Sequence, residues 1–397
     1  MNLAAPLALP CGARLGNRIA KAAMSENLAD ADHGPSAALS TLYGRWARSG
    51  AGLLITGNVM IDARHLGEPG DVVIDREVHL ERLTRWVAVA QGGGAAVWAQ
   101  INHPGRQAPR ALTPVPMAPS SLVLSTLGLF ARPRAMSAAD IDEVIVRFAD
   151  GADRARRAGF DGVQIHAAHG YLLSQFLSPR TNQRGDEWGG PLVARARLLL
   201  AVVRAVRDRV GPGFPVGVKL NSADFQRGGF TPEEAVEVAR WLADAGVDLL
   251  ELSGGNYEEP AMMRGERAST AARGAYFLGY AAKVRAATPV PLMVTGGFRT
   301  RAGMTAALAS GAVDVVGLAR PFVFDPLVAA RVLSGELEEL IVPTPRVGLR
   351  MADDILAVVW FQAQLARMAA GAEPDPRLGG WRTLLAKGRE AVRARRS

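Results

Sequence analysis

The most constraining feature of this 397-residue sequence is a regular alternation between short apolar segments and longer amphipathic ones. Near-continuous apolar runs of this kind are typical of strands buried on both faces, and their alternation with helical patterns predicts repeated βα units around a parallel sheet. Eight such runs precede residue 330: 19–24, 52–61, 96–103, 162–166, 215–221, 249–253, 291–295 and 315–319. Eight strands in about 300 residues predict an α/β fold of the (β/α)8 TIM-barrel type.

Helix signals between these runs support the same fold. The apolar spacing over 140–158, with Ser137 as an N-cap candidate, predicts an amphipathic helix, and Thr231 followed by a proline and two acids opens another. The same helix-to-strand joint, a glycine C-cap leading into an apolar run, recurs at 158–163, 245–250 and 310–316. Because no Gly-x-Gly-x-x-Gly follows any predicted strand, the barrel is favoured over a doubly wound nucleotide-binding sheet.

The barrel pattern ends near Ile341, and the residues beyond it predict a C-terminal helical appendage. We expect residues 1–341 to form the barrel and residues 342–397 the appendage, with helices over 346–370 and 381–397. The last of these helices is strongly basic, a property that could suit nucleic acid or an anionic membrane surface. Because neither interleaved aromatic residues nor a nucleic-acid motif accompanies the charge, a solvated helical end is the favoured interpretation.

Composition narrows the class of protein further. The chain is 49% hydrophobic and 21% charged, which is typical of a globular protein rather than a disordered one. It has neither a run of about 18 apolar residues nor a secretory leader pattern, so we expect a cytoplasmic protein. Its single cysteine, Cys11, excludes an intrachain disulfide and any iron–sulfur cluster or multi-thiolate zinc site held by this chain.

The densest cluster of chemically active residues lies at the end of the fourth predicted strand. It holds two of the six histidines, His166 and His169, and one of the five tyrosines, Tyr171. Residues three apart on a strand face opposite ways, so the imidazoles can converge only if the strand ends near His166, and Gly170 permits such a bend. Three interpretations are open: a metal site completed by His103, ordinary core or loop histidines, and hydrogen-bond donors for an oxygen that gains negative charge, with Tyr171 as the proton source.

The remaining histidines give weaker signals. His33, His65 and His79 are isolated along the sequence, which favours solvent-exposed side chains over catalytic ones. No other spacing supports a metal site with His103, and we therefore expect no metal.

Four motifs at the ends of predicted strands resemble those of the Old Yellow Enzyme family, FMN-dependent ene-reductases built on a (β/α)8 barrel. The run 166–190 resembles the family signature, and the resemblance continues through nearly the whole barrel. Segment 17–24 resembles the first-strand motif, segment 99–106 the third, and segment 317–321 the eighth. The resemblance implies FMN as cofactor and NADPH or NADH as reductant. We expect a homodimer or homotetramer with no nucleic-acid or membrane partner.

The resemblance also implies how FMN would be held. Met24 and Ser25 fall where the family lines the N5–C4a edge of the flavin, and Gly57 falls where a backbone N–H approaches that edge. Gln100 matches the glutamine that bonds the pyrimidine ring. Lys219 replaces an arginine of many members near N1 and C2=O, where a cation stabilises the reduced flavin. The phosphate would lie at the ends of the last two strands, on Gly296, Gly297, Ala319 and Arg320.

The implied reaction reduces the C=C bond of an activated alkene, such as an enone, enal or nitroalkene. His166 and His169 would bind the carbonyl or nitro oxygen of the substrate, and Tyr171 would protonate its α-carbon. Asn27, where one branch of the family has a tyrosine, and Tyr257 would line the substrate pocket. A flavin-dependent oxidase or amine demethylase on the same barrel, and a non-catalytic flavin-binding protein, are the alternatives.

Overall fold

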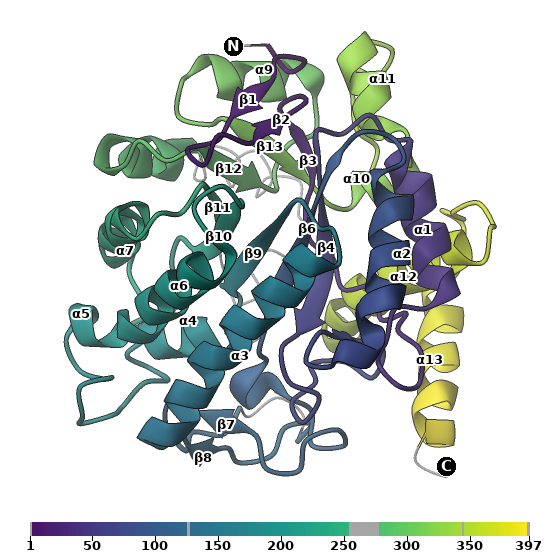
Figure 1. Ribbon diagram of the computed structural model, residues 1–397. Helices are drawn as coiled ribbons and strands as arrows, with labels where there is room; N and C mark the ends of the chain where they lie inside the picture. Colours follow the sequence, from purple (N-terminus) through teal and green to yellow (C-terminus); the bar gives the residue numbers. More distant parts are fainter. Residues whose placement is uncertain (1, 125–127, 254–277, 344, 395–397) are drawn as a thin grey trace.

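The computed structural model describes residues 2–124, 128–253, 278–343 and 345–394 of the chain. Its centre is a closed barrel of parallel strands (Figure 1). In barrel order the strands are β3 (Ile19–Lys21), β4 (Leu53–Met60), β6 (Ala96–Asn102), β9 (Gly162–Ala167), β10 (Val216–Asn221), β11 (Leu249–Ser253), β12 (Leu292–Thr295) and β13 (Val315–Leu318). Because β13 pairs with β3 and β3 pairs with β4, the sheet closes on itself, and the predicted (β/α)8 fold is confirmed.

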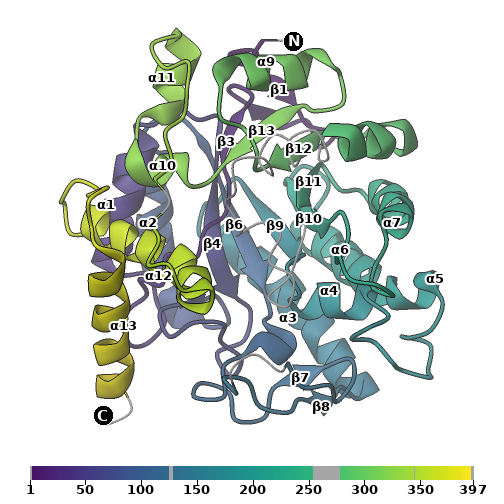
Figure 2. The ribbon, with the colours of Figure 1, turned by 180° about the vertical axis from the view of Figure 1, so that it is seen from behind.

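Helices surround this barrel in both ribbon views (Figures 1 and 2). They are α1 (Ala37–Ala47), α2 (Leu80–Gln91), α3 (Ala138–Arg157), α4 (Leu172–Leu177), α5 (Leu192–Arg195), α6 (Arg197–Val210), α7 (Pro232–Asp244), α9 (Arg301–Ala309), α10 (Pro321–Phe324), α11 (Val328–Ser334), α12 (Arg350–Ala369) and α13 (Gly380–Ala394), with 3-10 turns η1 (Glu77–His79) and η2 (Gly105–Gln107). Short strands outside the barrel are β1 (Leu7–Ala8), β2 (Arg14–Leu15), β5 (Val72–Val73), β7 (Met117–Ala118) and β8 (Arg134–Ala135).

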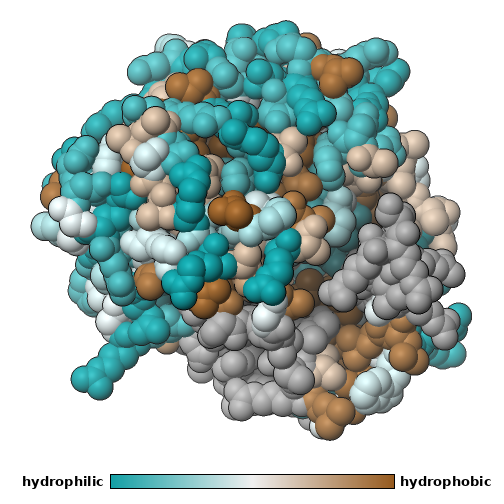
Figure 3. Space-filling view, turned by 90° about the horizontal axis from the view of Figure 1, so that it is seen from below, coloured by the Kyte–Doolittle hydropathy of each residue, from teal (hydrophilic) through white to brown (hydrophobic). Residues whose placement is uncertain are grey.

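No helix in the described ranges combines the length and the apolar character that a membrane crossing requires. Hydrophilic side chains also cover much of the face shown in Figure 3.

The predicted helix boundaries are confirmed by their caps. The Ser137 side chain accepts from the Asp140 N–H and the Thr231 side chain from the Glu234 N–H, and both helices have a complete capping box. The three predicted joints turn through glycines with positive φ, at Gly159, Gly246 and Gly311. Each joint returns the chain from the outside of the barrel into the next strand.

The two helices predicted beyond the barrel are present as α12 and α13, and α12 packs against α1 and α10. Trp360 of α12 is buried, with its ring centroid 5.4 Å from that of Phe324 in α10. The Arg45 guanidinium of α1 also donates to the Ala372 carbonyl just after α12, at 2.7 Å. Both ribbon views place α12 beside α1 (Figures 1 and 2), and α13 packs against α12. The division of the chain at residue 341 stays a prediction.

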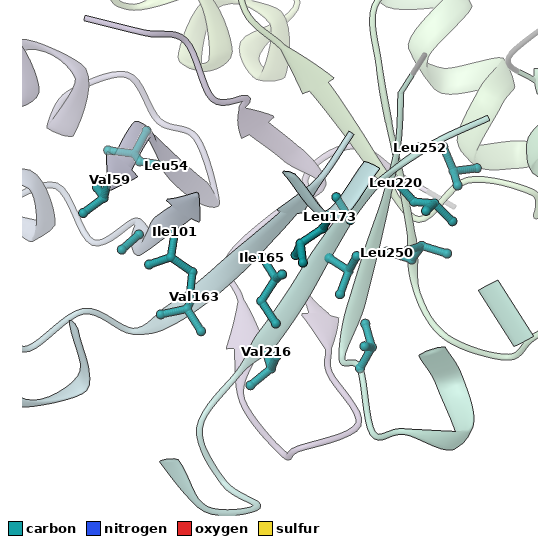
Figure 4. Packing of buried hydrophobic residues seen from close by; sticks show 14 of the residues in the cluster. Leu54, Val59, Ile101, Val163, Ile165, Leu173, Val216, Leu220, Leu250 and Leu252 are labelled. Carbon is teal, nitrogen blue, oxygen red and sulfur yellow. The ribbon is translucent and has the colours of Figure 1, made fainter. Parts of the chain in front are cut away.

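Aliphatic side chains on the outer faces of the strands form the main core with the helices. Along β9, Val163 and Ile165 point outward, and Leu250 and Leu252 do so along β11 (Figure 4). Leu173 of α4 packs in the same cluster. Because every second residue of a strand faces outward, the residues between them face the barrel interior.

At the end of the barrel where the strands begin, the interior is filled by an apolar cluster around Trp98, which is fully buried. Its partners come from neighbouring strands and include Leu53, Ile55, Leu249, Met293 and Val315. Two glycines make room for the indole: an added Cβ at Gly162 would lie 2.6 Å from Trp98 Nε1, and one at Gly217 would lie 2.8 Å from Trp98 Cζ3. The apolar cluster closes the barrel and leaves its other end for polar chemistry.

We therefore expect Gly162→Ala to lower the free energy of unfolding by about 1–3 kcal/mol, because the new methyl group overpacks the barrel against Trp98 and Pro215. Urea denaturation would measure the loss. Gly185→Ala is the matched control, since an added Cβ there meets no atom of the described residues within 4 Å. Equal stability of the two variants would mean that the indole shifts without cost.

Candidate active site

Two histidines and a tyrosine converge where β9 ends. The strand stops at Ala167, and the chain turns through His169 and Gly170, with φ values of 59° and 77°. The His166 and His169 rings are thereby 5.1 Å apart between centroids, and the Tyr171 ring lies 4.8 Å from that of His166. The bend expected from the sequence is present, and the structure brings these three side chains together.

Hydrogen bonds orient both imidazoles. His166 Nδ1 accepts from the Ala168 N–H at 3.2 Å, so in the neutral ring the proton resides on Nε2. His169 Nε2 lies 2.7 Å from Ser253 Oγ at the end of β11, and the His169 backbone N–H donates to Asn221 Oδ1 at the end of β10. The second imidazole is therefore positioned by two strands that lie far from it in the sequence.

Both rings are neutral at physiological pH. Burial holds the pKa of His166 well below its ordinary value of 6.5, and the neighbouring His169 and Lys219 lower it further. Burial, together with Lys219, likewise lowers the pKa of His169 well below 6.5. Neutral imidazoles can donate a hydrogen bond to an oxygen without presenting a full charge to it.

These shifts make stability depend on pH. Below about pH 6.5 the unfolded chain binds protons on His166 and His169 that the folded protein does not bind, so the free energy of unfolding falls as the pH is lowered. Each such histidine contributes up to about 1.4 kcal/mol per pH unit in that window. Urea denaturation at about pH 7 and about pH 5.5 would measure the loss, and His166→Asn should reduce its slope. An unchanged slope in that variant would contradict a depressed pKa.

The Tyr171 hydroxyl accepts a hydrogen bond from Asn58 Nδ2 at 3.2 Å. The same amide nitrogen donates to Ser25 Oγ at 3.2 Å, and Asn102 Nδ2 donates to Asn58 Oδ1. Asn58 faces this way because β4 shifts register between Ile55 and Asn58, which places both residues on the inner side of the strand. One amide thus joins Tyr171 to a residue predicted at the flavin edge.

A second set of polar side chains lies inside the barrel, between the Trp98 cluster and the carboxyl ends of the strands. Gln100 Nε2 donates to Gln164 Oε1 at 2.6 Å, and Gln164 Nε2 donates to Glu251 Oε2 at 2.8 Å. Lys219 Nζ lies 3.0 Å from Glu251 Oε1. The predicted residues Gln100 and Lys219 therefore belong to one buried network, whose other two members were not predicted.

The four residues predicted to hold a phosphate lie at the ends of neighbouring strands. Gly296 and Gly297 follow β12 with φ values of 103° and 83°, while Ala319 and Arg320 follow β13, which pairs with β12. The guanidinium of Arg320 stacks on Phe361 of α12 at 5.2 Å. Consecutive glycines of this conformation can turn backbone N–H groups toward an anion. The buried Thr295 hydroxyl nearby also has no hydrogen-bond partner among the described residues, so this corner suits a phosphate.

The remaining predicted residues are placed as follows. Met24 is half-buried against the core. The backbone N–H of Gly57 donates to Glu26 Oε1 at 3.0 Å, and Asn27 Oδ1 accepts from the Gly70 N–H at 2.6 Å. Their predicted contacts with flavin and substrate stay predictions. Tyr257 lies outside the described residues.

His103 does not join His166 and His169. It lies beside Asp62 and His65, and the ring centroids of His103 and His65 are 4.8 Å apart. The prediction that His65 and His79 are solvent-exposed is wrong: their exposed fractions are 7% and 1%. Asp62 accepts from Arg64 at 2.9 Å and 2.7 Å, so its charge is already neutralised. His103 Nδ1 accepts from the Gly105 N–H, which leaves the proton on Nε2 and no lone pair there for a metal. We therefore interpret Asp62, His65 and His103 as a structural cluster rather than a metal site.

Comparison with known proteins agrees with this arrangement. The model of the NADH:flavin oxidoreductase / NADH oxidase family matches residues 2–339. The chain belongs to this family. It is 37% identical over 361 residues to the NADH-dependent flavin oxidoreductase iliE of Hypocrea jecorina, covering 84% of this chain and 89% of that protein. It is 39% identical to the protein of the same name from Neonectria sp., covering 81% of this chain and 46% of that longer protein.

Among solved structures, the old yellow enzyme homologue from Zymomonas mobilis superposes with a TM-score of 0.73 at 26% identity, covering 86% of this chain and 95% of the other. The match confirms the predicted family, its barrel fold and the class of flavin-dependent oxidoreductases that use FMN and a nicotinamide.

The residues that hydrogen-bond or ion-pair with the predicted site residues, and so position them, were not predicted from the sequence. They are Asn58, Gln164, Asn221, Glu251 and Ser253. A signal was available, because each is a polar residue within or at the end of an otherwise apolar strand, where polar groups need partners. Which residues pair across strands could not be read from that signal.

Proposed function

We propose that this chain is an NADPH- or NADH-dependent ene-reductase that reduces the C=C bond of activated alkenes such as enones, enals and nitroalkenes. The observation that carries the proposal is the convergence, at the carboxyl end of β9, of a tyrosine and two imidazoles, one buried and one half-buried, whose pKa values lie well below 6.5. In TIM barrels this end of the strands holds the active site.

The residues at this end suit FMN. Gln100 offers a second N–H and a carbonyl oxygen to the pyrimidine ring, Lys219 offers a cation, and the glycine pair 296–297 with Arg320 offers donors to the phosphate. Ser25 and Met24 would line the reactive edge. When bound, FMN accepts a hydride from the nicotinamide and passes it to the alkene.

The protein's own groups would act on the alkene's activating group. His166 Nε2–H and the imidazole of His169 would donate to its carbonyl or nitro oxygen, on which negative charge grows. Tyr171 would give its proton to the α-carbon, and the N–H that Asn58 donates to the Tyr171 oxygen would stabilise that oxygen as the proton leaves.

An anaerobic titration tests the proposal. The FMN-loaded protein is reduced with NADPH or NADH, then mixed with 2-cyclohexenone while flavin absorbance is followed. Recovery of the oxidised spectrum without oxygen, together with cyclohexanone as product, supports the ene-reductase. Recovery only with oxygen, or bleaching by an amine, would replace it by the oxidase or the demethylase. Failure to bind any flavin would contradict the whole assignment.

The homo-oligomeric state and the cytoplasmic location stay predictions. Size-exclusion chromatography with light scattering would decide between the homodimer and the homotetramer.

A further inference from the structure

Lys219 and Glu251 form an ion pair inside the barrel. They are register partners on the neighbouring strands β10 and β11, with Lys219 Nζ 3.0 Å from Glu251 Oε1. Their side chains are only 4% and 0% exposed, so water screens neither charge. A lone buried carboxylate would be costly, and here it is matched by one cation.

The other carboxylate oxygen of Glu251 accepts from Gln164 Nε2, and Gln164 in turn accepts from Gln100. Glu251 therefore has a hydrogen bond at one oxygen and an ion-pair contact at the other, and this network joins Lys219 to Gln100, the two residues that would hold the flavin pyrimidine. The nearby buried charges also balance, because Lys21 Nζ lies 4.0 Å from Glu26 Oε1. His166, the register partner of Lys219 on β9, adds no charge while it is neutral.

We propose that Glu251 is a positioning residue that offsets the charge of Lys219 and thereby sets the midpoint potential of the bound flavin. The inference rests on the proposed function in one respect, that Lys219 lies beside the flavin. A bare cation would strongly favour the negative charge that a flavin gains on reduction. A cation paired at 3.0 Å favours it much less, since at the flavin the field of the carboxylate opposes that of the ammonium.

This role differs from a purely structural one. A buried ion pair retained only for packing would change stability when broken but would leave the flavin potential where it was. A pair that acts on the flavin must move the potential in opposite directions when either partner is neutralised.

The experiment measures the midpoint potential of the FMN-loaded protein by reductive titration against a reference dye, with dithionite as reductant. Glu251→Gln keeps the shape of the side chain and an acceptor for Gln164 but removes the charge. We expect the potential of E251Q to rise, with the equilibrium constant for two-electron reduction increasing at least about tenfold, which is about 30 mV. Lys219→Gln should lower the potential.

The double variant K219Q/E251Q neutralises both members of the pair, so neither is left as an unpaired buried ion, and its potential should return close to that of the parent protein. Asp248→Asn is the matched control: it removes a buried carboxylate, paired with Arg207, just before β11 begins, and should not move the potential. An unchanged potential in E251Q overturns the proposal. If E251Q binds too little FMN to be titrated, the double variant decides the question. A midpoint potential of the double variant as low as that of K219Q alone would then overturn the proposal.

These measurements need neither a nicotinamide nor an alkene. A protein that binds FMN and shows the opposed shifts but fails to reduce enones would therefore refute the proposed function and leave this inference standing. If the protein reduces enones but the potential of E251Q is unshifted, the proposed function stands and this inference fails.

Discussion

Replacing His169 by alanine should slow enone reduction by about 10²–10³-fold, because it removes a preorganised hydrogen-bond donor to an oxygen that gains charge in the transition state. The same loss is expected for His166→Ala, since the two rings lie together at the end of β9. The rate to measure is that at which 2-cyclohexenone reoxidises the reduced flavin in a stopped-flow experiment.

A conservative substitution should restore part of this rate. His169 has a positive φ of 59°, a conformation that asparagine tolerates better than most residues, and an asparagine amide still offers an N–H. His169→Asn should therefore be faster than His169→Ala. His79→Ala is the matched control, because it removes a buried imidazole that contacts Arg82 and lies outside this cluster. If His169→Ala reoxidises at the parent rate, the proposed function fails.

Tyr171→Phe should slow the same reoxidation step by about 10²–10⁴-fold, the usual contribution of a positioned general acid. The ring and its contact with His166 are retained in this variant, and only the hydroxyl that faces Asn58 is lost. The measurement is again the reoxidation of reduced flavin by 2-cyclohexenone, followed in H2O and in D2O.

The internal control for this variant is its reduction by NADPH or NADH, a step that requires no proton from Tyr171 and should stay near the parent rate. Should both steps slow equally, Tyr171 would be a packing residue of the site. Loss of the solvent isotope effect in the variant would agree with proton transfer through the hydroxyl.

Much of the fold could be predicted from the sequence because its signals are local. The capping boxes at Ser137 and Thr231 need only residues three positions apart, and the glycine joints at Gly159, Gly246 and Gly311 need only one backbone conformation. The His166 cluster was visible for the same reason: its three members lie within six residues, and Gly170 marks the bend.

The partners of that cluster depend on how the barrel closes. Glu251 meets Lys219 because β10 and β11 pair in one particular register, and His169 meets Ser253 across 84 positions of sequence. Asn58 faces Tyr171 only because a bulge in β4 changes which residues point inward. His65 likewise packs against His103, which follows a different strand, β6.

The sequence by itself thus determined the order of strands and helices, the barrel they form and the residue types at the strand ends, since these follow from periodicity, caps and turns. The tertiary structure alone decided which buried polar groups neutralise or orient one another. The physical reason is that a buried charge or amide must be paired wherever the fold places it, and that place is set by strand register and closure rather than by neighbours along the chain.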